Sequence, residues 1–158
     1  MPNLHVLIYK PCRWFLPRKA SHWALLLLNE DVNSDDVNSD DVKSGDFNSD
    51  DVGIVFDVQK NAFKSKKTQF ATLDFKKIRD NVHSAIALEI QVTEYQLNMI
   101  CQDVSKNRPF HLLSRNCQHW VLEVIKRLVE ELHISNGDEI IHNIKRLGHV
   151  PITERFIV

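Results

Sequence analysis

The chain has 158 residues, of which 43% are hydrophobic and 26% charged, a composition typical of one globular domain with its own core. Its longest apolar run, Trp23 to Leu28, is far short of the roughly 20 residues that a membrane-spanning helix requires, and its first residues lack the pattern of a signal peptide. We therefore expect a single domain over residues 1–158, no transmembrane segment and a cytoplasmic location.

Charge is unevenly distributed along the chain. The net charge is −1, but residues 31–52 hold eight Asp and one Lys, which leaves 13 acidic and 19 basic residues elsewhere. Lysines gather between residues 60 and 77, with Asp74 close by. Such a cluster is more often a solvated surface than a binding site, so we predict no nucleic-acid partner.

The cysteines indicate reduced thiols. Cys12, Cys101 and Cys117 are odd in number and have no metal-ligand spacing, so they favour neither a disulfide framework nor a zinc site. We expect no metal and no other cofactor. Cys101 falls on an apolar helical stripe, and we interpret it as a core residue.

The N-terminal part of the chain predicts two strands. Residues 4–9 (LHVLIY) are apolar and β-branched, and Pro11 ends the run. Residues 22–28 (HWALLLL) are hydrophobic at almost every position, which is typical of a strand buried on both faces. The two-residue period of a strand places His22 on the same side as Ala24 and Leu26.

Residues 31–50 repeat a pentapeptide four times, as DVNSD DVNSD DVKSG DFNSD. One apolar residue in five matches neither a helical nor a strand period, so we interpret residues 31–52 as an Asp-rich loop insertion, exposed to solvent and dispensable for folding. The spacing of Asp31, Asn33 and Asp35 resembles the start of a calcium-binding loop. Asp36 stands where such a loop needs Gly, and no Glu occupies its twelfth position, so we predict no calcium site.

The sequence after the repeats predicts three more strands and three helices. The first strand, residues 53–58 (GIVFDV), follows the repeats directly, which makes them the enlarged tip of a hairpin with residues 22–28. Thr93 and Gln96 form a capping box, which indicates a helix start. The remaining strands are predicted at residues 69–75 and 85–92, and the helices at residues 93–106, 117–132 and 138–147. A small antiparallel sheet packed against about three helices is an α+β fold.

Residues 115–120 (RNCQHW) place a thiol at the start of the best predicted helix. From Cys117 onwards, apolar residues recur every three or four positions, so one face of this helix is buried. Asn116 is a preferred N-cap residue, and the N–H groups at a helix N-terminus favour the thiolate, which is the nucleophilic form. Taken alone, Cys117 is better explained as a small core residue at the start of the apolar stripe.

His22 and Asp57 are the candidate partners of this thiol, because a nucleophilic cysteine needs a base and a group that orients the base. If residues 31–52 are a hairpin tip, His22 and Asp57 lie on paired antiparallel strands, where neighbouring side chains stand about 4.5–5.5 Å apart. We expect the sheet that carries them to pack against the first turn of the Cys117 helix. A carboxylate on one imidazole nitrogen fixes the tautomer and leaves the other nitrogen for the thiol.

Three neighbours of Cys117 are supporting candidates. Gln118 is able to contribute to an oxyanion site, although the backbone N–H of Cys117 is the simpler donor. His119 lies about 200° around the helix from Cys117, so we interpret it as a structural or supporting residue. Asn116 would support the site as the N-cap.

The blocks HWALLLL, GIVFDV and RNCQHW resemble those of the circularly permuted papain-like (NlpC-type) superfamily, in particular its lecithin:retinol acyltransferase-like members and small phospholipid acyltransferases. Permuted cysteine peptidases that cleave ubiquitin-like conjugates belong to the same group. The resemblance implies that Cys117 is the nucleophile and His22 the general base, with Asp57 where the acyltransferases have an orienting histidine. This chain departs from them in Asp57, which replaces His, in the extra Asp-rich insertion, and in Gln118 and Trp120, which replace Glu and Phe. We also expect it to lack their C-terminal membrane anchor.

Two classes of function follow. The resemblance implies a thiol hydrolase or acyltransferase with a Cys-His-Asp triad and an acyl-enzyme intermediate, acting on a peptide, a protein conjugate or an acyl lipid. A peptidase or isopeptidase is favoured over a lipid acyltransferase, because the sequence contains no anchor and no amphipathic membrane helix. The alternative is a catalytically inactive papain-like module that binds a protein partner through the acidic repeats or the lysine cluster.

Overall fold

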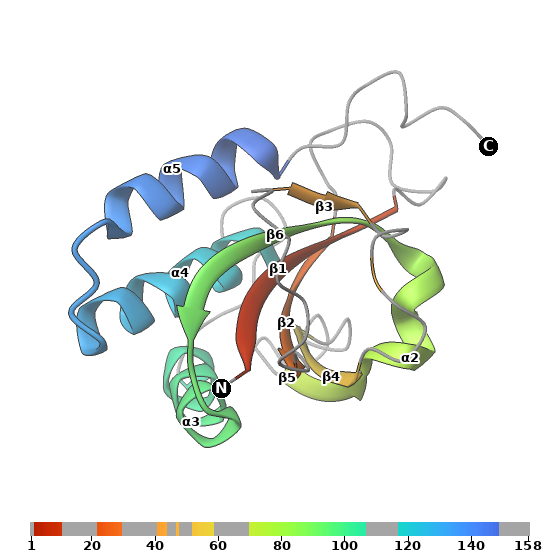
Figure 1. The fold of residues 1–158 in the computed structure, drawn as a ribbon. Helices are drawn as coiled ribbons and strands as arrows, with labels where there is room; N and C mark the ends of the chain where they lie inside the picture. Colours follow the sequence, from red (N-terminus) through yellow and green to blue (C-terminus); the bar gives the residue numbers. More distant parts are fainter. Residues whose placement is uncertain are drawn as a thin grey trace.

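The structure is a computed structural model, and it describes residues 2–10, 22–29, 41–43, 47, 52–58, 70–106 and 117–148. Six strands form one sheet, which Figure 1 shows in the colours of the sequence. The strands are β1 (Asn3–Tyr9), β2 (Trp23–Asn29), β3 (Asp41–Lys43), β4 (Val52–Val58), β5 (Phe70–Asp74) and β6 (Val82–Gln91). The described helices are α2 (Phe75–Ile78), the 3-10 turn η2 (Arg79–Asn81), α3 (Glu94–Ser105), α4 (Cys117–Glu131) and α5 (Gly137–Leu147).

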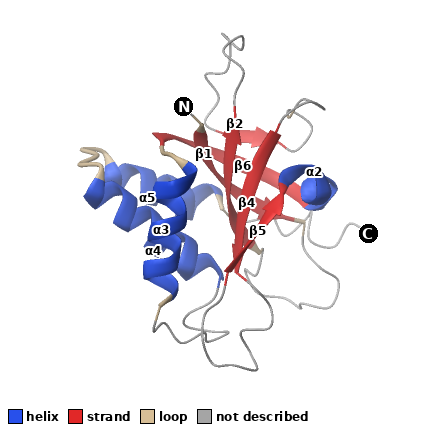
Figure 2. Cartoon of the chain, turned by 90° about the horizontal axis from the view of Figure 1, so that it is seen from below, coloured by secondary structure: helices blue, strands red, loops and turns tan. Residues whose placement is uncertain are grey.

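The sheet has the order β3-β6-β1-β2-β4-β5, and every neighbouring pair is antiparallel. Helices α3, α4 and α5 cover one face of the sheet, and the short helix α2 lies on the other (Figure 2). The predicted α+β class is therefore confirmed, with three of the helices in one layer. Among the described residues, no helix is long and apolar enough to cross a membrane.

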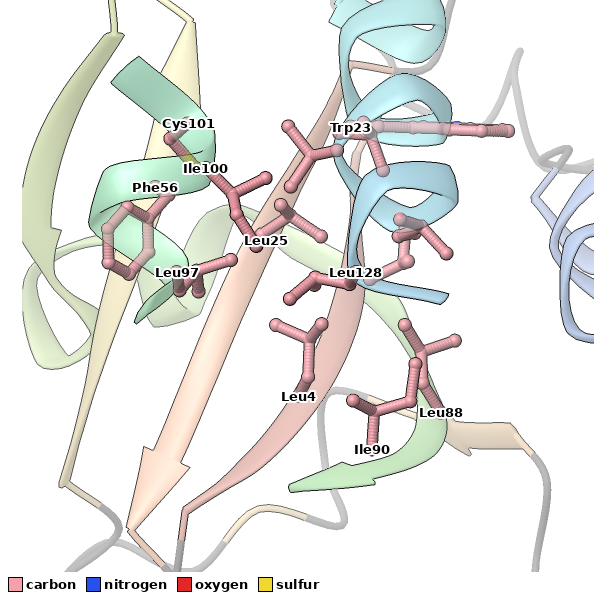
Figure 3. Close-up of a cluster of buried hydrophobic side chains, with 14 of the residues drawn as sticks. Leu4, Trp23, Leu25, Phe56, Leu88, Ile90, Leu97, Ile100, Cys101 and Leu128 are labelled. Carbon is pink, nitrogen blue, oxygen red and sulfur yellow. The ribbon is translucent and has the colours of Figure 1, made fainter. Parts of the chain in front are cut away.

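Alternation along the central strands divides the core into two parts. In β1, Leu4, Val6 and Ile8 point towards α3, α4 and α5, whereas Leu7 points towards α2. Both sets are fully or almost fully buried, which explains why β1 and β2 read as unbroken apolar runs. The larger part of the core lies under the three helices, and Figure 3 shows its side chains from Leu4 and Leu25 to Leu128 packed together.

The helices start where their local sequence predicts. Thr93 and Gln96 form the expected capping box: the Gln96 N–H donates to the Thr93 hydroxyl oxygen at 3.1 Å, and the Thr93 N–H donates to the Gln96 side-chain oxygen at 3.1 Å. Helix α4 begins at Cys117, as its apolar stripe predicts. Helix α2 was not predicted: the strand expected over residues 69–75 ends at Asp74, which caps α2 by accepting a hydrogen bond from the Lys76 N–H at 3.1 Å.

The predicted hairpin between β2 and β4 is confirmed, since Leu25 pairs with Phe56 and Leu28 with Gly53. The interpretation of the intervening residues 31–52 as an exposed loop insertion is wrong at two places. Residues 41–43 form β3, which pairs with β6 at the edge of the sheet. Phe47 is only 5% exposed and packs with Phe75 at a ring-centroid distance of 5.0 Å.

Physical reasons account for both departures. The free edge of β6 offers backbone N–H and C=O groups, which pair with another strand whatever its side chains are, so β3 needs no apolar pattern. Phe47 is the one aromatic residue among the repeats and replaces the Val of the other copies, so it is large enough to fill a place beside Phe75 and His5. The rest of the repeat tract lies outside the described residues.

We expect Phe47→Ala to lower the free energy of unfolding by about 3 kcal/mol, because truncating a buried Phe leaves a cavity in the core on the α2 side. Chemical denaturation followed by fluorescence measures the change. Val52→Ala is the control, since Val52 is 50% exposed and its truncation should stay within about 0.5 kcal/mol of the wild type. If both variants unfold at the wild-type midpoint, the tract is dispensable after all.

Candidate functional site

His22 lies immediately before β2, and the end of β1 holds its backbone. The Tyr9 N–H donates a hydrogen bond to the carbonyl oxygen of His22 at 2.9 Å, one step beyond the pairing of Ile8 with Trp23. Tyr9 and His22 are therefore direct cross-strand neighbours. Their rings are in contact, with centroids 5.0 Å apart and planes inclined by 56°.

Asp57 is the penultimate residue of β4, at the same end of the sheet. The pairing of Leu25 with Phe56 sets Asp57 beside Ala24, so Asp57 is the diagonal neighbour of His22 and not the direct one. The side chain of Asp57 faces away from α4, because Phe56 and Val58 on either side of it belong to the core under the three helices. His22, Asp57 and Tyr9 thus share the α2 side of the sheet.

The His22 and Asp57 side chains form an ion pair, in which Nε2 of His22 contacts Oδ1 of Asp57. The exposed fraction is 31% for the His22 side chain and 14% for that of Asp57, so the ion pair is mostly but not completely shielded from solvent. In such surroundings a charge-assisted hydrogen bond holds the imidazole in one orientation.

Cys117 reaches the same imidazole from the other side of the sheet. It is the first residue of α4, whose apolar stripe packs on the face opposite His22, and its thiol is half-buried. The Cys117 thiol interacts with the His22 side chain, and this interaction is among the causes that raise the pKa of His22. His22 lies at the end of the sheet where β1 ends and β2 begins. Helix α4 therefore packs on one face of the sheet, and its first residue reaches past this end to a histidine on the opposite face.

The electrostatics of His22 follow from these two partners. Burial by itself lowers the pKa of His22, but the hydrogen bonds to Asp57 and Cys117, with the charges of both groups, raise it to about 10. Because the pKa lies above the usual value of 6.5, the imidazolium persists throughout the neutral range and is lost only as the pH rises through about 10. At neutral pH His22 is therefore a cation between two acidic groups.

This arrangement contains the three groups that activation of a thiol requires. Because Nε2 faces Asp57, Nδ1 is the ring nitrogen that remains for the sulfur. An imidazolium beside the sulfur stabilises a thiolate, and the same group is able to return a proton to a leaving group. The structure thus brings together all three residues that the sequence predicts as catalytic: Cys117, His22 and Asp57.

The three supporting candidates differ in how buried they are and in whether the structure describes them. Gln118 is half-buried in the first turn of α4, and His119 is exposed. The exposure of His119 agrees with its predicted direction away from the thiol. Asn116, the predicted N-cap, and Cys12 lie outside the described residues, as do the lysines at 60–67. Cys101 is fully buried in α3, and burial raises the pKa of its thiol, as expected of a core residue.

Sequence reasoning missed Tyr9, which was predicted only as the last residue of a strand. Its hydroxyl donates to Oδ2 of Asp57 at 3.2 Å. Burial and the neighbouring Asp57 carboxylate, which accepts this hydrogen bond, raise the pKa of Tyr9 far above its usual value, so its hydroxyl stays protonated. A pairing of residues 4–9 with residues 22–28 would have placed Tyr9 beside His22, but the sequence prediction paired residues 22–28 only with residues 53–58.

Among the described residues, no group of three or more His, Cys, Asp and Glu side chains is arranged to hold a metal ion. Comparison of the chain with protein-family models, with curated proteins and with solved structures finds no match. The class of this site is therefore defined by its geometry: a half-buried cysteine at a helix N-terminus, a histidine and an aspartate.

Proposed function

We propose that this chain is a papain-like thiol hydrolase or acyltransferase in which Cys117 is the nucleophile, His22 the general base and acid, and Asp57 the residue that orients His22. The observation that carries the proposal is that His22 forms an ion pair with Asp57 and also interacts with the Cys117 thiol. An arrangement of carboxylate, imidazole and thiol is the one that nucleophilic catalysis by cysteine requires.

The proposed reaction runs in two steps. The Cys117 thiolate attacks a carbonyl carbon, and the His22 imidazolium gives its proton to the departing amine or alkoxide, which leaves Cys117 as a thioester. Neutral His22 then takes a proton from water or from an acceptor amine as that nucleophile attacks the thioester, and Cys117 leaves as the thiolate. The backbone N–H of Cys117, which points out of the helix start, is a donor for the oxyanion.

The substrate class is a peptide, a protein conjugate or an acyl lipid, joined through an amide, isopeptide or ester bond. The order along the chain, His22 then Asp57 then Cys117, and the position of the cysteine at the start of a helix against an antiparallel sheet support the permuted papain-like assignment. A catalytically inactive module of the same fold, which binds a protein partner, is the other candidate. The reactivity of the thiol separates the two.

We expect Cys117 to be alkylated by iodoacetamide faster than Cys101 at neutral pH, because Cys117 is half-buried beside an imidazolium whereas Cys101 is fully buried without one. Cys12 is expected to react slowly as well, since its sequence neighbours offer no comparable partner. The labelling is measured from about pH 6 to about pH 11 and resolved by site with mass spectrometry. The plot of the Cys117 alkylation rate against pH should show a step near pH 10, where His22 loses its proton.

The controls are Cys117→Ser, which removes the fast site, and Cys101→Ser, which should leave the rate at Cys117 unchanged. Equal rates at all three cysteines would favour the inactive binding module. A fast Cys117 whose profile has no step near pH 10 would show that the thiol is accessible but not paired with His22.

A further inference from the structure

The carboxylate of Asp57 has a partner on each of its oxygens. Oδ1 meets Nε2 of His22, and Oδ2 accepts the hydrogen bond from the Tyr9 hydroxyl. A carboxylate held at one oxygen alone is free to rotate about its last bond, which has a broad and nearly two-fold potential. With both oxygens held, Oδ1 stays in line with the imidazole.

Tyr9 also contacts His22 directly, through two different parts of the residue. Its backbone N–H holds the His22 carbonyl oxygen at 2.9 Å, and its ring lies against the imidazole at 5.0 Å. Tyr9 is half-buried and packs on the core of the α2 side, next to Leu7 on the same face of β1. A side chain anchored in the core thus reaches both members of the His22–Asp57 pair.

We propose that Tyr9 is a positioning residue of the site, whose hydroxyl holds the Asp57 carboxylate so that it orients His22 towards Cys117. The inference rests on the function proposed above, because the orientation of His22 matters to the chemistry only if His22 serves the thiol. The Tyr9 hydroxyl touches no reacting atom: it acts on His22 through Asp57.

The hydroxyl is the part of Tyr9 that a merely structural role would not need. A phenylalanine would keep the strand, the packing on Leu7 and the ring contact with His22, and would lose only the bond to Oδ2 of Asp57. The expected consequence is a less ordered carboxylate and a weaker hydrogen bond to Nε2, which is one of the interactions that raise the pKa of His22.

The test is Tyr9→Phe, followed by the titration of His22 in the NMR spectrum of the full chain. We expect the His22 titration midpoint to fall by about 1 pH unit, a tenfold loss of proton affinity. The step near pH 10 in the Cys117 alkylation rate should move to lower pH by the same amount. Tyr95→Phe is the matched control: it removes the same hydroxyl from a residue that is 74% exposed on α3, and should leave both midpoints unchanged.

A double variant shows whether Tyr9 acts through Asp57. In an Asp57→Ala background, Tyr9→Phe should add no further shift to the His22 midpoint, because the carboxylate that the hydroxyl holds is gone. An additive shift would overturn the proposal, as would a Tyr9→Phe chain that titrates like Tyr95→Phe. The NMR measurement does not depend on the reactivity of the thiol, so the two proposals fail separately. Slow alkylation of Cys117 would count against the proposed function, and an unchanged His22 midpoint in Tyr9→Phe would count against the positioning role of Tyr9.

Discussion

The variant His22→Ala is expected to lower the rate at which Cys117 is acylated by about 10²- to 10⁴-fold at neutral pH. A positioned general acid and base contributes a factor of this size, and His22 is proposed to fill both roles. In the wild type His22 stays protonated beside the Cys117 sulfur up to about pH 10. Without His22, the N-terminus of α4 remains as a favourable influence on the charge of Cys117.

The measurement uses p-nitrophenyl acetate as an activated ester, with release of nitrophenolate as the signal and Cys117→Ser as the background. Asp57→Ala should slow the acylation less than His22→Ala, because it removes the group that orients the imidazole but keeps the imidazole itself as acid and base. The matched control is His142→Ala, which removes an exposed histidine of α5. A His22→Ala rate within about threefold of the wild type would contradict the catalytic role of His22.

Much of the fold could be predicted from the sequence because its signals are local. The apolar runs of β1 and β2, the capping box of Thr93 and the helical stripe that begins at Cys117 depend only on neighbours along the chain. The meeting of His22 with Asp57 needed one further assumption, the hairpin between their strands, and the pairing of β2 with β4 confirms that assumption.

What could not be predicted depends on contacts between distant segments. Strand β3 forms on a backbone edge, which leaves no side-chain pattern, and the burial of Phe47 depends on a space beside Phe75 that only the folded sheet creates. The register between β2 and β4 also depends on contacts between distant segments. A direct pairing was expected for His22 and Asp57, whereas the observed one is diagonal. The direct neighbour of His22 is Tyr9 of β1, on the other side of β2.

Trp120 links the fold to the site, because it lies one turn after Cys117 in α4. Its side chain is 1% exposed, its indole N–H donates to the Ser105 hydroxyl oxygen at 2.9 Å, and its ring lies 5.9 Å from that of Phe70. These contacts join the start of α4 to the end of α3 and to β5. The position of the thiol above the sheet therefore depends on the packing of Trp120.

Trp120→Ala is expected to lower the free energy of unfolding by about 3–5 kcal/mol, the usual cost of removing a fully buried Trp side chain. Ser105→Ala separates the hydrogen bond from the packing: it leaves the ring in place and the buried indole N–H without its acceptor, which should cost about 1–3 kcal/mol. Guanidinium denaturation of both variants provides the comparison. A loss below about 1 kcal/mol for Trp120→Ala would contradict this packing, because a fully buried indole cannot be removed so cheaply from a close-packed core. If α4 is anchored as described, the Trp120→Ala chain should also show a slower and less pH-dependent alkylation of Cys117 under conditions where it remains folded, since its thiol is no longer held against His22.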